Sequence, residues 1–401
     1  MKKLYFDYAA ATPVAPGVRR AIEPYLSEIF GNPGSIHFFG QLANKAVDEA
    51  REKILKIIGA PAENFRGLIF TGSATEANNL ALRGAIRKFY ELNRDDKFLP
   101  VRVIISAIEH ESVLATAEDL EAEGVELVIL PVDEKGLVDA PELKKFLNQR
   151  TAVVSIMSAN NEVGAVEPIG EIGEIISEFR KNNNSSYPLF HADSVQSFQY
   201  LNLNPEADHI DLVSISGHKI YGPKGIGGLY IGKHASFISP IITGGGQEFG
   251  LRSGTENVPG IVGLAVAVEE AAALRDSERK RLNGLKIYFW QKLKSFFPEA
   301  RLNAAEEKDF SAEPLSFLPH ILNLRFPGLK AEEVIFRLDR AGVAISAGSA
   351  CAARSISPSR VIRALGYGER EALESVRISF GRETSKKEID EAIKRISIAL
   401  G

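Results

Sequence analysis

The chain has 401 residues, of which 45% are hydrophobic and 25% are charged, so it carries enough apolar side chains for a core of good size. Its net charge of −4, and the lack of any basic stretch interleaved with aromatic residues, argue against nucleic acid as a partner. The single cysteine excludes an intrachain disulfide and a multi-cysteine metal site, and it fits a reducing cytoplasm. No stretch approaches the roughly 20 apolar residues of a membrane span, so no membrane partner is expected.

Strands and helices alternate through the first two thirds of the chain. Short apolar runs predict strands at 67–71, 101–106, 125–131, 151–157, 188–191, 210–215 and 229–231. Apolar positions at helical spacing predict helices at 16–29, 40–58, 112–123, 140–148, 169–181 and 257–296, and another that begins at 75. This alternation predicts a mostly parallel sheet covered on both faces, in which a ligand lies at the carboxyl ends of the strands.

The pattern changes in the last third of the chain. Strands are predicted at 321–326, 343–346 and 376–379, and helices at 331–341 and 387–400. The polar residues 304–316 are predicted to be an exposed connector. This order of elements indicates an α+β unit rather than a continuation of the doubly wound sheet.

A lysine follows the strand predicted at 210–215. The turn Ser216-Gly217-His218-Lys219 begins with two small residues, and a glycine-rich segment comes after it. This arrangement suits a lysine on a tight loop that could form a Schiff base, and Asp193, at the end of an earlier strand, could pair with a pyridine nitrogen. The two residues are typical of pyridoxal phosphate (PLP) chemistry. A surface lysine in a turn is the simpler interpretation of this segment alone.

A second strand runs directly into a helix at residues 71–78, with the sequence TGSATEAN. Small residues at a helix N-terminus allow backbone N–H groups to approach an anion such as a phosphate. The alternative is a plain helix start with Ser73 or Thr75 as the N-cap. The segment does not match the GxxxxGK[ST] phosphate loop, which argues against a nucleotide triphosphatase.

Two further segments are candidates for function. His110 follows the strand predicted at 101–106, where it could stack on a flat cofactor or move a proton, although it could also be an ordinary loop histidine. Residues 244–255 are too rich in glycine for a helix or strand, and they indicate either a functional loop or a flexible connector.

The only thiol, Cys351, lies among small residues in Gly348-Ser349-Ala350-Cys351-Ala352-Ala353. Few bulky neighbours are present to bury it, unlike most free cysteines. Arg354 and Arg360 are close in sequence, so we expect a positive surrounding that lowers the pKa of the thiol and favours the thiolate.

Together these motifs resemble the cysteine desulfurases, the NifS/IscS-like enzymes of the class V aminotransferase superfamily with PLP fold type I. The resemblance runs from Asp7 to Gly381 and rests on residues 71–78, His110, Asn160-Asn161-Glu162-Val163-Gly164, and residues 191–196, 216–222, 252–255 and 348–351. It implies a large PLP-binding domain at 14–261, with a mostly parallel seven-stranded sheet flanked by helices. Residues 1–13 and 262–401 would form a smaller α+β domain that carries the Cys351 loop.

The resemblance also implies how the cofactor PLP is held. Lys219 would bind it covalently and His110 would stack on its ring. Asp193 would pair with the pyridine nitrogen, and Gln196 with the ring hydroxyl oxygen. The phosphate would be bound by Ala74, Thr75, Ser216 and His218, and by Thr255 from the other subunit of a homodimer.

The implied reaction converts L-cysteine to L-alanine and leaves the sulfur as a persulfide on Cys351. The residues implied for the carboxylate of the substrate are Asn32, Arg377 and Asn161, of which Asn161 also belongs to the cofactor site. No metal is implied. A sulfur-acceptor protein, either an iron–sulfur scaffold or a sulfurtransferase, is the expected partner.

Three alternatives stay open at this point. A selenocysteine lyase or another class V aminotransferase-like enzyme would share the PLP site, although an aminotransferase needs no thiol at Cys351. A non-catalytic protein on the same fold would lack the cofactor. A thiolate metal protein is disfavoured by the single cysteine.

Overall fold

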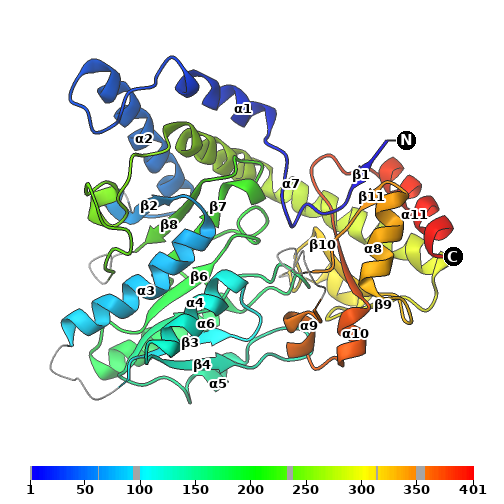
Figure 1. Cartoon of the computed structure of the whole chain (residues 1–401). Coiled ribbons are helices and arrows are strands. Elements are labelled where there is room, and N and C mark those ends of the chain that lie inside the picture. The colour runs from blue at the N-terminus through cyan, green and yellow to red at the C-terminus, as the bar shows by residue number, and fades with distance from the viewer. Residues whose placement is uncertain (1, 62, 94–99, 233–237, 313–314, 349–356) are drawn as a thin grey trace.

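The computed structural model describes residues 2–61, 63–93, 100–232, 238–312, 315–348 and 357–401. Its larger part is a sheet between helices, and a smaller part from the last third of the chain lies beside it (Figure 1). The sheet consists of β2 (Leu68–Thr71), β3 (Arg102–Ser106), β4 (Glu126–Leu130), β5 (Thr151–Ser155), β6 (Leu189–Asp193), β7 (Leu212–Ser216) and β8 (Gly227–Ile231).

The strand order is β2-β8-β7-β6-β5-β3-β4. Strand β8 is antiparallel to both of its neighbours, β2 and β7, and the other neighbouring strands are parallel. The predicted α/β fold, with a mostly parallel seven-stranded sheet flanked by helices, is therefore confirmed.

Successive side chains of the strands pack against helices on opposite faces of the sheet. Val103 and Ile105 of β3 belong to the core under α3 (Ala74–Leu92) and α4 (Glu111–Ala122). Ile104 belongs to the core under α2 (Phe38–Ile57) and α6 (Ile169–Asn183). Because both faces are covered, these strands are continuous apolar runs in the sequence rather than alternating ones.

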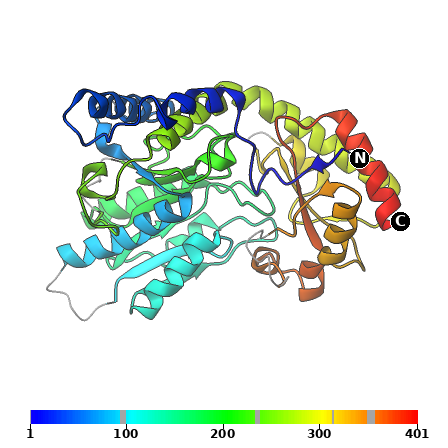
Figure 2. The same cartoon turned by 45° about the horizontal axis from the view of Figure 1, so that its top comes forward.

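The smaller part has its own antiparallel sheet, in which β10 (Ile321–Arg325) lies between β9 (Arg301–Leu302) and β12 (Ser375–Ser379). The beginning of the chain joins this part, because β1 (Leu4–Tyr5) pairs in parallel with β11 (Val343–Ala344). Figure 2 shows the N-terminus beside the last helix. The shorter helices of the fold and those of this part are α1 (Pro16–Ile22), α5 (Ala140–Leu143), α8 (Ala331–Arg340), α9 (Arg360–Ala364), α10 (Glu369–Leu373) and α11 (Lys386–Leu400).

Helix α7 (Val258–Phe296) is 39 residues long and extends through both parts (Figure 1). Its buried residues up to Ala271 belong to a core of the large sheet, and those from Leu282 belong to the core of the smaller part. The predicted domain boundary between residues 261 and 262 falls within this helix and stays a prediction. Among the described helices, none has the length and apolar character needed to cross a membrane.

Several predicted elements differ from the observed ones. The helix predicted at 140–148 is limited to α5, and β9, α9 and α10 were not predicted. The segment 304–316 is not a simple exposed connector, because it contains a 3-10 helix, Glu307–Ser311. Phe310 in that helix is buried, and the amine of Lys286 lies 4.5 Å from the centre of its ring.

A buried ion pair joins α2 to the glycine-rich segment that precedes α7. Arg51 Nη2 lies 2.8 Å from Glu248 Oε1, and both side chains are at most 3% exposed. Glu248 Oε2 also accepts a 2.8 Å hydrogen bond from the backbone N–H of Phe70 in β2. The carboxylate therefore holds a helix and an edge strand together.

We expect Arg51→Met to lower the free energy of unfolding by about 3–5 kcal/mol, because it leaves the Glu248 carboxylate buried without its counter-ion. Lys45→Met is the control, since Lys45 and Glu49 form an exposed pair and should contribute about 0.5 kcal/mol or less. Urea denaturation of the three proteins measures both effects. If the two variants lose equal free energy of unfolding, the buried pair contributes no more to stability than the exposed one.

The imidazole of His191 in β6 lies fully buried between serines of the two neighbouring strands. Its Nδ1 is 2.8 Å from Ser155 Oγ in β5, and its Nε2 is 3.0 Å from Ser214 Oγ in β7. Burial lowers the pKa of His191 to about 4. In the unfolded chain this imidazole is protonated near pH 6.5, whereas in the folded chain it stays neutral until about pH 4. The free energy of unfolding therefore decreases as the pH falls through this range.

His191→Gln should reduce the loss of unfolding free energy between pH 7.5 and pH 5 by about 2 kcal/mol relative to the parent protein. Denaturation curves at the two pH values measure this difference. If His191→Gln has the same pH dependence as the parent, the protonation of this imidazole does not limit acid stability.

Candidate active site

A cavity of about 590 Å³ lies at the carboxyl ends of the sheet strands, where β12 and the beginning of the chain meet the large sheet. Its lining includes side chains from both ends of the chain. The predicted site residues that line it are Ala74, Thr75, His110, Asn161, Asp193, Gln196, Ser216, His218, Lys219 and Arg377. Ten of the predicted residues, from segments far apart in the sequence, thus share one cavity.

Lys219 reaches the cavity from a tight turn after β7. The turn is a 3-10 helix at Gly217–Lys219, and a Cβ on Gly217 would come within 2.7 Å of the carbonyl oxygen of Pro223. Lys219 Nζ donates to the carbonyl oxygens of Ala9 and Ala10, at 2.6 and 2.9 Å. The small residues predicted to make a tight loop therefore place the amine against the N-terminal segment of the chain.

The start of α3 forms another wall of the cavity. Of the two residues predicted as possible N-caps, Ser73 is the N-cap, and it accepts a 3.1 Å hydrogen bond from the N–H of Glu76. The N–H groups of Ala74 and Thr75 have no partner within the helix by its geometry, and the positive end of this 19-residue helix faces the cavity, where it would favour an anion. A Cβ on Gly227 of β8 would lie 2.9 Å from the nitrogen of Ala74, so glycine permits this close approach.

A chain of hydrogen bonds runs from Asp193 to His110. Asn78 Nδ2 donates to Asp193 Oδ2 and to Ser112 Oγ, both at 2.8 Å. Ser112 comes two residues after His110, whose Nδ1 accepts a 3.1 Å hydrogen bond from the Ser112 N–H. Neither Asn78 nor Ser112 was identified from the sequence as a site residue. A buried amide among the apolar residues of α3 was the available signal for Asn78.

Two histidines of the cavity are held in the neutral form. Burial lowers the pKa of His110, and burial together with the nearby Lys219 lowers the pKa of His218 to about 4. Nδ1 of His218 lies 2.9 Å from Ser216 Oγ. With its Nδ1 occupied by the Ser112 N–H, neutral His110 has Nε2 left to carry its proton.

Arg377 of β12 is one of the largest fully buried side chains among the described residues. Its Nη1 donates to the carbonyl oxygen of Asn161 and its Nη2 to Asp7 Oδ1, at 2.8 and 2.9 Å. Its Nε is buried and has no hydrogen-bond partner among the described residues. Two of the five N–H donors of this guanidinium therefore hold the surrounding chain, and the Nε–H is among those left for a ligand.

Two other predicted residues lie outside this cavity. Asn32 does not line this cavity, and its Oδ1 accepts from the N–H of Gly34 in its own loop. Thr255 lines a separate cavity beside Arg252. Cys351 lies outside the described residues, as does Arg354. Gln196 lines the cavity but its amide donates to the carbonyl of Ala9, so its predicted contact with a ring hydroxyl stays a prediction.

Arg360 is the described member of the two arginines expected to influence the thiol. Its guanidinium donates to the carbonyl oxygens of Ala107 and Glu109, in the segment that leads to His110. It lines the cavity, but its effect on the pKa of Cys351 stays a prediction.

Comparisons with known proteins agree with this arrangement. The family described as "Aminotransferase class-V" matches residues 4–392. A relative from Bacillus subtilis (strain 168) named "Putative cysteine desulfurase IscS 1" is 40% identical over 398 residues, which are 99% of this chain and 98% of the relative. "Cysteine desulfurase IscS" from Dictyoglomus turgidum is 40% identical over 389 residues, 97% of this chain and 92% of the relative.

Solved structures with the same fold include a "NIFS-LIKE PROTEIN" with a TM-score of 0.87 and 33% identity, covering 99% of both chains. A "NifS-like protein from Rickettsia africae ESF-5" has a TM-score of 0.82 and 29% identity, again over 99% of both chains. The family match and the identity both extend over nearly the whole chain. The chain therefore belongs to the class V aminotransferase family and, within it, to the IscS/NifS-like cysteine desulfurases.

Proposed function

We propose that this protein converts L-cysteine to L-alanine with PLP as cofactor and carries the sulfur as a persulfide on Cys351. The observation that carries this proposal is the single cavity that holds Lys219, Asp193, His110 and Arg377. Gly348 and Ser357, the described residues on either side of the segment that contains Cys351, line the same cavity.

The described residues fit PLP. Lys219 offers an amine, and Asp193, which is 5% exposed, offers a carboxylate that Asn78 orients. The N–H groups of Ala74 and Thr75 at the start of α3, which line the cavity, offer an anion site for the phosphate. When bound, this cofactor supplies an electron-accepting ring that stabilises negative charge on the substrate carbon.

The substrate would be oriented by its carboxylate. Arg377 has a buried donor to spare at Nε, and a guanidinium binds a carboxylate with good geometry. Asn161 lies beside it, since its carbonyl accepts from Arg377 Nη1. His110 would hold or move a proton at Nε2, because Nδ1 is occupied by the Ser112 N–H. Asn32 was also predicted to hold the substrate carboxylate. It lies outside this cavity, so its place gives that prediction no support.

Sulfur transfer would be a displacement at the sulfur of bound L-cysteine. The thiolate of Cys351 attacks that sulfur, so a sulfur–sulfur bond forms and the carbon–sulfur bond breaks. The electron pair of the broken bond stays with the carbon, which takes up a proton on the way to L-alanine. The persulfide on Cys351 then passes its outer sulfur to an acceptor protein, which we propose to be an iron–sulfur scaffold or a sulfurtransferase of the cytoplasm.

A selenocysteine lyase or another class V enzyme is less favoured. The relatives over the full length bear the name cysteine desulfurase. An aminotransferase would need no thiol between Gly348 and Ser357.

We also propose a homodimer. Exposed apolar side chains gather in the loop before α2 and at its start, and the rings of Phe30 and Phe39 stack at 5.5 Å. Ile36 and Phe38 are 92% and 66% exposed. Thr255, which lies outside the main cavity of its own chain, could then serve the site of the other subunit.

Purified protein with PLP should release alanine and sulfide from L-cysteine under reducing conditions. Cys351→Ala should release neither above about 1% of the parent rate while keeping the bound cofactor, because only the carrier thiol is lost. Lys219→Ala should lose the borohydride-reducible linkage to the cofactor as well. Alanine absent from the parent protein with the cofactor bound would contradict the proposed reaction.

The double variant Ile36→Asp, Phe38→Asp should raise the dissociation constant of the dimer at least about tenfold, because charges replace the apolar contact. Analytical ultracentrifugation should show the mass fall from twice 43.7 kDa towards a single chain. Phe336→Asp, Ile398→Asp is the matched control, since these side chains are 62% and 74% exposed on the smaller part. A parent protein that sediments as a monomer would rule the homodimer out.

A further inference from the structure

Glu162 contacts both ends of the segment that contains Cys351. It belongs to the Asn160–Gly164 motif, in which only Asn161 received a role from the sequence. The Ser359 hydroxyl donates to Glu162 Oε2 at 2.5 Å. On the other side of the segment, a Cβ on Gly348 would lie 2.6 Å from the same oxygen, so the backbone of Gly348 packs directly against this carboxyl group.

The direction of the Ser359 hydroxyl is determined by a second contact. Ser359 is the N-cap of α9, and its Oγ accepts a 3.2 Å hydrogen bond from the N–H of Ile362. Since that lone pair is used by the helix, the hydroxyl proton is directed to Glu162. A helix cap needs only the hydroxyl, so capping α9 does not explain why a carboxyl group is buried beside it.

Burying this carboxyl group costs free energy, so its presence here needs an explanation. Glu162 is 5% exposed, and burial raises its pKa, while the hydrogen bond from Ser359 and the positive charge of Arg377 act in the opposite direction. The group is thus kept buried by a hydrogen bond at one end of the segment and by a close backbone contact at the other.

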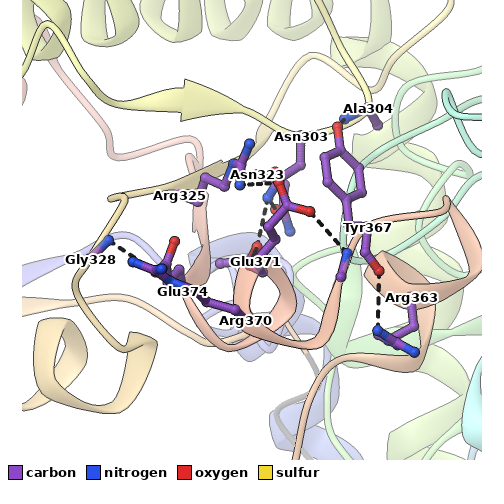
Figure 3. A network of polar contacts seen from close by, with 12 residues as sticks. Asn303, Ala304, Asn323, Arg325, Gly328, Arg363, Tyr367, Arg370, Glu371 and Glu374 are labelled. Carbon is purple, nitrogen blue, oxygen red and sulfur yellow. Dashed lines mark hydrogen bonds and ion pairs between the residues drawn. The ribbon is translucent and has the colours of Figure 1, made fainter.

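The backbone of Glu162 is held rigidly. Its N–H donates to Asn160 Oδ1 at 2.8 Å, and its carbonyl accepts a 3.1 Å hydrogen bond from Asn323 Nδ2. Asn323 belongs to the polar network of Figure 3, in which Asn303 Nδ2 donates to Asn323 Oδ1 at 2.7 Å. Because Asn161, the preceding residue, accepts from Arg377, one short stretch connects the proposed substrate site with both ends of the Cys351 segment.

The chain after Ser359 is also held in place. Arg360 donates to the carbonyls of Ala107 and Glu109. Beyond α9, the hydroxyl of Tyr367 accepts from the N–H of Ala304, as Figure 3 shows. Glu162 therefore acts between fixed elements, and its removal would free the ends of the segment rather than the whole region.

We propose that Glu162 is a positioning residue for sulfur transfer, which holds Gly348 and Ser359 together beside the cavity and so sets where Cys351 is presented to bound L-cysteine. This inference rests on the proposed role of Cys351 as the sulfur carrier. Glu162 lines the cavity, and its side-chain contacts with Ser359 and Gly348 assign it a positioning role rather than a binding one.

Glu162→Ala should lower the rate of alanine formation on the order of tenfold or more, because misplacing a reacting group by about an ångström costs rate steeply. The KM for L-cysteine and the change in cofactor absorbance on adding L-cysteine should stay within about twofold, since those report earlier steps. Glu162→Gln should recover much of the rate, because its carbonyl still accepts from Ser359. Glu174→Gln, at an exposed carboxylate of α6, is the control for lost charge.

Ser359→Ala tests the same contact from the other side and keeps the proposal falsifiable if Glu162→Ala fails to fold. It should lower the rate of alanine formation, and combining it with Glu162→Ala should add little, because both remove one interaction. Ser385→Ala is its control: Ser385 caps α11 by accepting from the N–H of Glu388, so it loses a cap far from this contact.

An unchanged rate in Ser359→Ala and Glu162→Ala would overturn the inference, as would a change confined to KM or to cofactor absorbance. The Cys351→Ala protein separates this result from a failure of the proposed function. If the parent is active and Cys351→Ala is inactive, the role of the thiol holds while that of Glu162 falls. If Cys351→Ala is as active as the parent, the proposed function itself fails.

Discussion

The buried guanidinium of Arg377 is the interaction on which the cavity depends. A cation in this position would be very costly without partners, and it has two: the carboxylate of Asp7 and the carbonyl of Asn161. Asp7 comes from the first strand region of the chain, Asn161 from a loop after β5, and Arg377 from β12. Neutralising one charge therefore requires three distant stretches to meet, and the cavity is formed where they do.

The local parts of this arrangement could be predicted from the sequence. Strand runs were recognisable because both faces of the sheet are covered, and Lys219, Asp193 and His110 each follow such a run closely. Parallel strands bring their carboxyl ends to one edge, so residues identified separately fell into the same cavity. Strand β8 runs antiparallel, so it is its start rather than its end that lies near α3. Gly227 at that start has no side chain, which lets the strand pack closely against the beginning of the helix.

Contacts between segments could not be predicted in the same way. Asn78 bonds Asp193 across 115 residues, and nothing in the periodicity of α3 shows which partner its amide meets. Phe310 was assigned to an exposed connector because its neighbours are polar, yet it is buried beside Lys286. Thr255 has the residue type expected for a phosphate site, but one chain alone does not bring it there. Each of these differences arises from packing between separate elements. The residue composition of a single element does not show which other element it will contact.

Helix α7 links the two parts mechanically. At about 1.5 Å per residue its 39 residues form a continuous rod of nearly 60 Å. One end of the rod packs in the core of the large sheet, and the other end packs in the core of the smaller part. Neither core is complete without its share of this rod, so the parts should melt in one cooperative step rather than one after the other. A break in the backbone of the rod would leave two fragments that each expose an apolar face. The helix thus makes the fold of the catalytic half depend on the integrity of the other.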